Sequence, residues 1–125
     1  MESSNKKYIY IIEDDLAIRS LLIELLESEG YQVGSAGNGQ EAIDFLSQSK
    51  KLPALILVDL AMPIKGGLQF RKEQKALENL ATIPTIMMSA SGDEGRSIAE
   101  SEMSGFLTKP IDLNLFLETI GAHLP

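Results

Sequence analysis

The segment Ala54-Leu-Ile-Leu-Val-Asp-Leu-Ala-Met-Pro63 is an apolar run that ends in a single acid, Asp59. A short, uninterrupted apolar run is typical of a strand that is buried on both faces of a sheet. The proline that follows indicates that the chain turns away soon after the acid. The segment therefore predicts a central strand of a parallel sheet, with one carboxylate where that strand reaches water.

Similar short apolar segments alternate along the chain with longer helix-like segments. A parallel sheet covered by helices on both faces produces this alternation. The expected strands are Tyr8–Ile12, Gln32–Ala36, Leu55–Leu60, Thr85–Ser89 and Gly105–Thr108. The chain of 125 residues is long enough for one core of its own, so we expect a single α/β domain over residues 1–125.

The helices are predicted from the spacing of apolar residues and from capping residues. The first has apolar residues three and four positions apart, namely Ile18, Leu21, Leu22, Leu25 and Leu26. Asp14 or Asp15 would cap it, and Gly30 would end it. Asn38, with Glu41 three residues later, predicts the start of the second.

Three further helices are expected in the second half of the chain. Two are less regular in pattern, over Gly67–Leu80 and Asp93–Ser104. The last begins at a cap residue, Asp112, and is expected to bury Leu113, Phe116, Ile120 and Leu124.

The composition excludes several classes of function. A net charge of −7 and a pI near 4.6 oppose direct binding of nucleic acid. The absence of cysteine excludes disulfides and thiolate metal sites and is compatible with a cytoplasmic location, which we expect. No apolar stretch approaches the ~18 residues needed to span a bilayer, so no membrane association is expected.

Polar residues stand where the other strands are expected to end. Glu13-Asp14-Asp15 follows the first strand, Ser89 ends the fourth, and Lys109 follows the fifth. Acids, a hydroxyl and an amine at one edge of a sheet suggest a site for magnesium-assisted phosphoryl chemistry.

In these features the chain resembles the response-regulator receiver domain, the phospho-accepting part of two-component signalling. The matching motifs are Asp14-Asp15, Asp59 in D-x-x-M-P, Gly67 eight residues beyond it, Ser89-Ala90, and Phe106 three residues before Lys109-Pro110. The resemblance covers nearly the whole chain. It implies a flavodoxin-like, doubly wound sheet of five parallel strands in the order 2-1-3-4-5, with five helices.

The resemblance also implies a metal site and a phosphoacceptor. Asp59 would take the phosphoryl group from a histidine kinase or a phosphotransfer protein. Asp15 and Asp59 would bind Mg²⁺ directly, Asp14 directly or through water, and the backbone carbonyl of Ala61 would be a further ligand.

Other residues would stabilise and report the phosphoryl group. Lys109 and Ser89 would each contact one of its oxygens. Movement of the Ser89 hydroxyl would let the Phe106 ring turn inward and change a protein-binding surface. Such a protein is a signalling switch that catalyses its own phosphorylation and slow dephosphorylation, not an enzyme with turnover. Its downstream partner and its oligomeric state are left open.

Some positions depart from the family pattern. Only 20 positions separate Ser89 from Lys109, about two fewer than in many receivers, which predicts a short or irregular fourth helix. Gln74 stands where an apolar residue is expected on the third helix. Phe106 lacks the hydroxyl of the more frequent tyrosine.

Each feature also has a plainer interpretation. Asp14 and Asp15 are common helix caps, Ser89 is a common turn residue, and Phe106 fits a core position. An aspartate-nucleophile phosphatase is a second class, although Ala61 stands where such enzymes carry their general acid. A phosphorylation-independent interaction module with the same fold is a third.

Overall fold

Five parallel strands form one sheet in the computed structural model, which describes residues 7–90 and 92–124. Their bounds are β1 Tyr8–Ile12, β2 Gln32–Ala36, β3 Leu55–Asp59, β4 Thr85–Ser89 and β5 Gly105–Thr108. Their order across the sheet is β2-β1-β3-β4-β5. The predicted order is confirmed, and the strand bounds agree with the sequence except that β3 ends one residue earlier.

The strand register brings several strand ends to the same edge. Ile12 of β1 pairs with Val58 of β3, so the residue after Ile12 lies level with Asp59. Asp59 in turn pairs with Met88 of β4. Side chains far apart in sequence are therefore neighbours at the carboxyl edge, where open α/β sheets bind their ligands.

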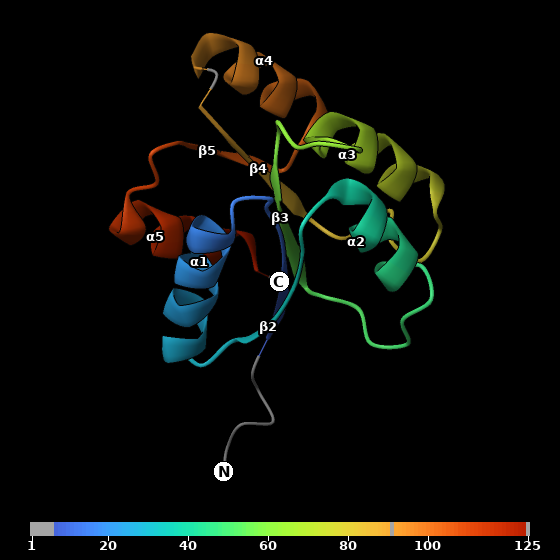
Figure 1. The fold of residues 1–125 in the computed structure, drawn as a ribbon, viewed down its shortest axis with the longest axis horizontal. Coiled ribbons are helices and arrows are strands. Elements are labelled where there is room, and N and C mark those ends of the chain that lie inside the picture. Colours follow the sequence, from blue (N-terminus) through green and yellow to red (C-terminus); the bar gives the residue numbers. More distant parts are fainter. Residues whose placement is uncertain (1–6, 91, 125) are drawn as a thin grey trace.

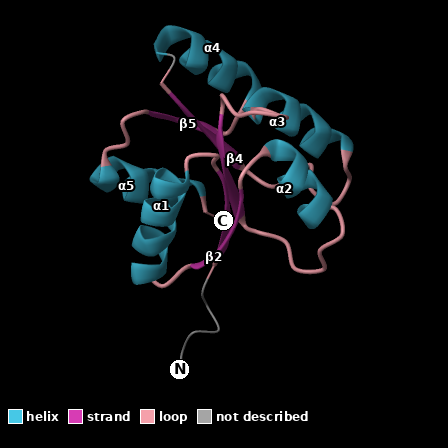
Figure 2. Cartoon of the chain, in the orientation of Figure 1, coloured by secondary structure: helices cyan, strands magenta, loops and turns pink. Residues whose placement is uncertain are grey.

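Four helices connect successive strands, and a fifth follows β5 (Figures 1 and 2). They are α1 Leu16–Ser28, α2 Gly39–Leu46, α3 Gly67–Ala76, α4 Gly92–Glu102 and α5 Leu113–His123. Side-chain caps begin three of them as predicted, from Asp15, Asn38 and Asp112. After α1, Gly30 adopts a φ of 93°, which glycine reaches without steric strain.

The helices lie on both faces of the sheet. In Figure 1, α1 and α5 cover one face, and α2, α3 and α4 lie on the other. Alternate residues of β1 point into the two cores: Ile9 and Ile11 pack towards α1 and α5, and Tyr10 and Ile12 towards α2 and α3. All five residues of β3 and all five of β4 are buried, as their unbroken apolar runs predict.

Three details differ from the sequence-based expectations. The fourth helix is neither short nor irregular, because α4 runs for 11 residues. Its connection to β5 is short and consists of Met103 and Ser104 alone. Leu21 and Leu113 are 49% and 41% exposed. The apolar stripes of α1 and α5 therefore include residues that the core does not cover.

Gln74, which interrupts the apolar stripe of α3, is fully buried in a polar network. Its amide donates to the carbonyls of Leu80 and Ile83, each at 3.0 Å. Its side-chain oxygen accepts from Arg71 at 3.0 Å and from the Thr85 hydroxyl at 2.9 Å. The network closes the turn between α3 and β4 because buried polar groups need such partners.

Arg71 extends this network to α4. Its Nε donates to the backbone carbonyl of Glu102 at 2.8 Å, so the C-terminal end of α4 is tied to α3.

Within the described part of the chain, no helix is long and apolar enough to cross a membrane.

Candidate functional site

Three carboxylates meet at the carboxyl edge of the sheet. One oxygen each of Glu13, Asp14 and Asp59 lies within 4.8 Å of the other two. Asp59 is the last residue of β3, and Glu13 extends β1, since its amide donates to the carbonyl of Ala36 at 3.1 Å. Glu13 is fully buried and Asp59 is 6% exposed, whereas Asp14 is exposed to solvent.

Lys109 provides the positive charge of this cluster. Its ammonium lies 2.9 Å from Glu13 Oε1 and 3.2 Å from Asp59 Oδ2. The backbone fixes its position, because the Lys109 amide donates to the carbonyl of Ser89 at 2.9 Å. Burial lowers the pKa of the Lys109 ammonium. The hydrogen bonds to Glu13 and Asp59 and the negative charges of these two residues outweigh burial, so the pKa is raised above its ordinary value. The amine therefore stays charged at neutral pH.

Asp59 is held in an environment that opposes its negative charge. Burial, the charge of Glu13 and, more weakly, the charge of Asp14 raise its pKa to about 6, against the opposing effect of Lys109. Like charges this close repel one another, and a single ammonium does not compensate three carboxylates. A divalent cation with a preference for oxygen ligands would complete the compensation, and Mg²⁺ has that preference.

Asp15 was predicted as a metal ligand, and the structure places it elsewhere. Its carboxylate caps α1 and accepts from the amide of Ile18 at 3.0 Å. The acids that the structure groups with Asp59 are Glu13 and Asp14, not Asp14 and Asp15. Asp15 as a metal ligand therefore stays a prediction that the grouping of these acids does not support.

Glu13 was expected at the sheet edge from the sequence, but it was not predicted as a metal ligand. The signal was present, because Glu13 follows the last apolar residue of β1 directly and is the first acid at the strand end. Its Oε2 also accepts from the amide of Asp15 at 3.1 Å, which orients the carboxylate at the start of α1.

The loop after β3 folds back closely over Asp59. The Gly67 amide donates to the carbonyl of Leu60 at 3.0 Å. A Cβ on Gly67 would lie 2.6 Å from the carbonyl oxygen of Asp59, so only glycine fits there without displacing the backbone. Ala61 lies in this loop, and its carbonyl as a metal ligand stays a prediction.

The two predicted switch residues lie beside this edge. Ser89 is the last residue of β4, is 2% exposed and pairs with Thr108 of β5. Phe106 lies further back on β5, opposite Met87, and is half-buried. The structure thus brings Ser89 next to the strand that carries Lys109, while Phe106 lies under α4.

An apolar hollow of about 250 Å³ adjoins Lys109 between α1 and the start of α5. It is lined by Ile18, Leu21, Leu22, Lys109, Pro110, Ile111 and Leu113. Leu16, at the first position of α1, adds an apolar side chain that is 65% exposed. The acidic cluster therefore has exposed apolar surface beside it, which often marks a site of protein contact.

Comparison with known families gives one match that spans most of the chain. A family model described as the response regulator receiver domain matches residues 9–121. That range contains every residue of the acidic cluster, Lys109, and both switch positions.

Two relatives agree with this match, and one solved structure shares the fold. The polar-differentiation response regulator DivK of Brucella anthropi is 35% identical over 121 residues, covering 94% of this chain and 96% of DivK. Sporulation initiation phosphotransferase F of Bacillus subtilis is 36% identical over 120 residues, covering 94% and 93%. The receiver domain of a sensor histidine kinase from Pseudomonas aeruginosa, solved with magnesium in its active-site cleft, has the same fold, with a TM-score of 0.84, 23% identity, and 94% and 96% coverage.

Proposed function

Because this chain belongs to the response regulator receiver domain family, we propose that it accepts a phosphoryl group on Asp59 and switches a protein-binding surface in response. The observation that carries this proposal is the convergence of Glu13, Asp14 and Asp59 on one point, with Lys109 bridging two of them.

Asp59 is suited to act as the nucleophile. An oxygen of its carboxylate would attack phosphorus, the bond from phosphorus to the donor histidine nitrogen would break, and that nitrogen would keep the electron pair and take up a proton. Phosphoryl transfer depends mainly on positioning and on neutralising charge, so a carboxylate fixed at a strand end beside an ammonium meets its main requirements.

The proposed metal ligands are Glu13, Asp14 and Asp59, with the Ala61 carbonyl as a further one. Mg²⁺ would supply charge neutralisation between the carboxylate and the incoming phosphoryl oxygens. Asp14 is exposed, so it would bind the ion directly or through water. The buried Glu13 would hold both the ion and Lys109 in place.

Lys109 and Ser89 would recognise the phosphoryl group itself. Lys109 bonds to Glu13 and Asp59 at rest, and it would exchange the contact to Asp59 for one to a phosphoryl oxygen. The hydroxyl of Ser89, at the end of the adjacent strand, would donate to another oxygen.

The phosphodonor is proposed to be a protein, either a histidine kinase or a histidine phosphotransfer protein. The exposed apolar surface around the hollow next to Lys109 supports this, because a protein donor can cover that surface and a small anionic donor cannot.

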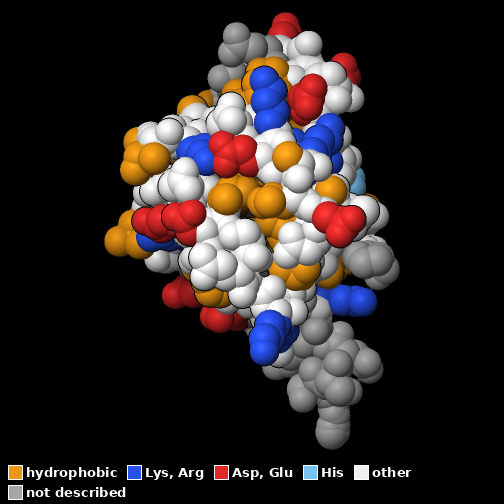
Figure 3. Space-filling model, turned by 90° about the vertical axis from the view of Figure 1, so that its right-hand side faces the viewer, with side chains coloured by type: hydrophobic (Ala, Val, Ile, Leu, Met, Phe, Trp, Pro, Cys, Tyr) orange, Lys and Arg blue, Asp and Glu red, His pale blue; other side chains and the backbone are white. Residues whose placement is uncertain are grey.

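The cytoplasmic location stays a prediction. Direct contact with nucleic acid is not expected at a net charge of −7, and on the face in Figure 3 lysine and arginine side chains lie singly among acidic and uncharged ones.

The name of the Bacillus relative adds a second candidate role. That protein is named a phosphotransferase, so the aspartyl phosphate of this chain could also serve as a donor to a further histidine. Transfer of a labelled phosphoryl group from the phosphorylated chain to an added histidine phosphotransfer protein would distinguish this role from that of a switch that only changes its binding surface.

The proposed function is tested by incubating the chain with Mg²⁺ and acetyl phosphate, with intact mass as the readout. We expect the mass to rise by one phosphoryl group in the wild type and in Asp44→Asn, a control that removes an exposed acid of α2. Asp59→Asn should show no gain. Equal mass spectra with and without acetyl phosphate would favour the phosphorylation-independent module instead.

A further inference from the structure

Gly95 of α4 lies in close contact with both predicted switch residues, Ser89 and Phe106. A Cβ built on Gly95 would lie 2.8 Å from Ser89 Oγ and 3.0 Å from Ser89 Cβ. The same Cβ would lie 3.2 Å from Cε1 of Phe106. Gly95 is buried, so the three residues form one packed contact between α4, the end of β4 and the middle of β5.

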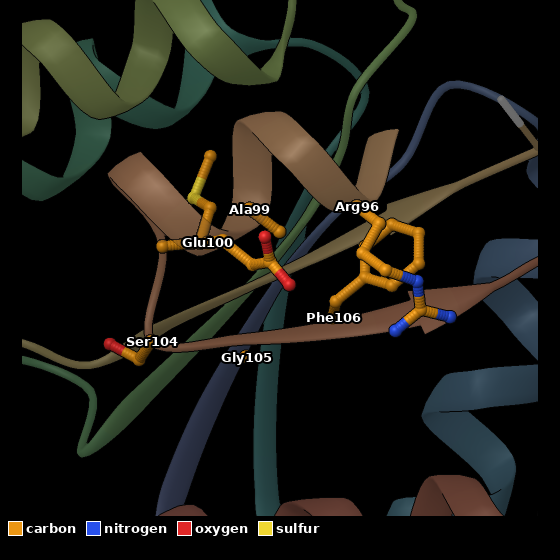
Figure 4. Close-up of a pocket in the computed structure, with 7 residues that line it drawn as sticks. Arg96, Ala99, Glu100, Ser104, Gly105 and Phe106 are labelled. Carbon is orange, nitrogen blue, oxygen red and sulfur yellow. The ribbon is translucent and has the colours of Figure 1, made fainter. Parts of the chain in front are cut away.

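The Phe106 ring is held at this contact from the outer side as well. Figure 4 shows the ring beneath α4, with the side chain of Arg96 reaching down beside it. The guanidinium carbon of Arg96 lies 5.3 Å from the ring centroid, within the range of a cation–π interaction. The ring therefore packs against both Arg96 and the bare backbone of Gly95.

Helix stability gives no reason for glycine at this position. Glycine inside a helix lowers the folding equilibrium constant by a factor of about two to five relative to alanine. Gly121, in α5, shows the ordinary case, because a Cβ there would meet nothing within 4 Å. What distinguishes Gly95 is the side chains that fill the space where its own would be.

We propose that Gly95 is a positioning residue for phosphoryl uptake: its missing side chain gives the Ser89 hydroxyl a resting place against α4 and so sets how readily that hydroxyl turns towards Asp59. This inference rests on the proposed function. Alanine at position 95 would leave 2.8 Å between its Cβ and Ser89 Oγ, and rotation about the Cα–Cβ bond of Ser89 relieves this contact, which is the tightest of the three. The contacts of 3.0 Å to Ser89 Cβ and 3.2 Å to Phe106 Cε1 are relieved by small shifts of the neighbouring groups. The orientations that face Asp59 then become more populated.

The test compares Gly95→Ala with Gly121→Ala, the matched glycine of α5. Affinity for beryllofluoride, a stand-in for the phosphoryl group on a carboxylate, is measured by titration at saturating Mg²⁺. Crowding at a buried contact disfavours a conformer by a factor of about five or more. We therefore expect Gly95→Ala to bind beryllofluoride about five times more tightly than the wild type. Gly121→Ala should be more resistant to urea, with unchanged affinity.

The role of Ser89 is checked by repeating the comparison in a Ser89→Ala background. Without the hydroxyl, alanine at position 95 should no longer increase the affinity. The inference is overturned if alanine at position 95 still increases the affinity for beryllofluoride in the Ser89→Ala background. It is also overturned if Gly95→Ala, with Ser89 in place, binds beryllofluoride no more tightly than the wild type. Failure of the wild type itself to bind beryllofluoride would instead refute the proposed function.

A measurement on the wild type alone covers the case in which Gly95→Ala does not fold. The amide resonance of Gly95 should shift on addition of beryllofluoride and Mg²⁺, beyond any shift caused by Mg²⁺ alone. That of Gly121, remote from the contact, should not. An unmoved Gly95 resonance in a protein that binds beryllofluoride also overturns the inference.

Discussion

The ammonium of Lys109 lies closer to Glu13 than to Asp59, at 2.9 Å against 3.2 Å. Glu13 is fully buried, so this hydrogen bond compensates a charge that has no access to water. The resting lysine is thus anchored by Glu13 and remains near the proposed phosphoacceptor. Once a phosphoryl group is present, Lys109 can keep its contact to Glu13 while it turns to the new oxygens.

The acidic pair at the site can be identified by neutralising one acid at a time. Glu13→Gln and Asp14→Asn should each weaken Mg²⁺ binding about tenfold or more, because each removes a charged oxygen ligand. Asp15→Asn should bind Mg²⁺ like the wild type, since asparagine caps a helix as well as aspartate does. Isothermal titration with MgCl₂ measures all three. Weakened binding by Asp15→Asn alone would restore the original assignment from sequence.

The three consecutive acids Glu13, Asp14 and Asp15 show where prediction from sequence reaches its limit. Apolar runs and turn residues determine where β1 ends, and the strand bounds follow from them directly. Which of three consecutive acids stays at the sheet edge depends on the backbone of one residue. Asp15 has φ −75° and ψ 113°, the extended conformation of an N-cap, and no side-chain pattern distinguishes it from Asp14.

Gln74 and Leu21 illustrate a second limit. A polar residue in an apolar stripe suggests a weak helix, yet Gln74 is buried because Arg71, Thr85 and two carbonyls supply its partners. Those partners are distant in sequence, so local periodicity carries no information about them. Leu21 belongs to the periodic stripe of α1 but lies beyond the area that the core covers.

The buried carboxylate of Asp59 should make the metal-free protein less stable as the pH rises. Its pKa of about 6 exceeds the ordinary 3.8, so between these values the folded state binds more protons than the unfolded chain. The favourable contribution of Asp59 to the free energy of unfolding is complete below pH 3.8 and is lost as the pH rises through 6. Asp59→Asn should therefore gain about 2 kcal/mol in free energy of unfolding over the wild type from pH 4 to pH 7.

Urea unfolding in EDTA, at several pH values, measures this difference. Saturating Mg²⁺ should reduce or reverse it, because the ion stabilises the charged form of the wild type and binds the variant less well. A constant difference between wild type and Asp59→Asn across this pH range would show that Asp59 has an ordinary pKa.

Replacing Lys109 tests how strongly the acids depend on its charge. Lys109→Met leaves Glu13 and Asp59 without their cation and should lower the free energy of unfolding in EDTA by about 2–4 kcal/mol at pH 7. Mg²⁺ should restore part of the loss. Lys109→Arg keeps the charge and serves as the control. Equal stability of Lys109→Met and the wild type in EDTA would mean that the acids are compensated by other groups.

The Arg71–Gln74 network should contribute to stability without affecting phosphoryl uptake. Gln74→Leu removes the acceptor of Arg71 and Thr85 and the donor to two carbonyls, so buried polar groups lose their partners. We expect a loss of about 2–3 kcal/mol in free energy of unfolding. Gln69→Leu, on the exposed face of α3, is the control and should change stability little. Both variants should take up phosphate from acetyl phosphate at the wild-type rate, because the network lies at the end of β4 opposite Ser89.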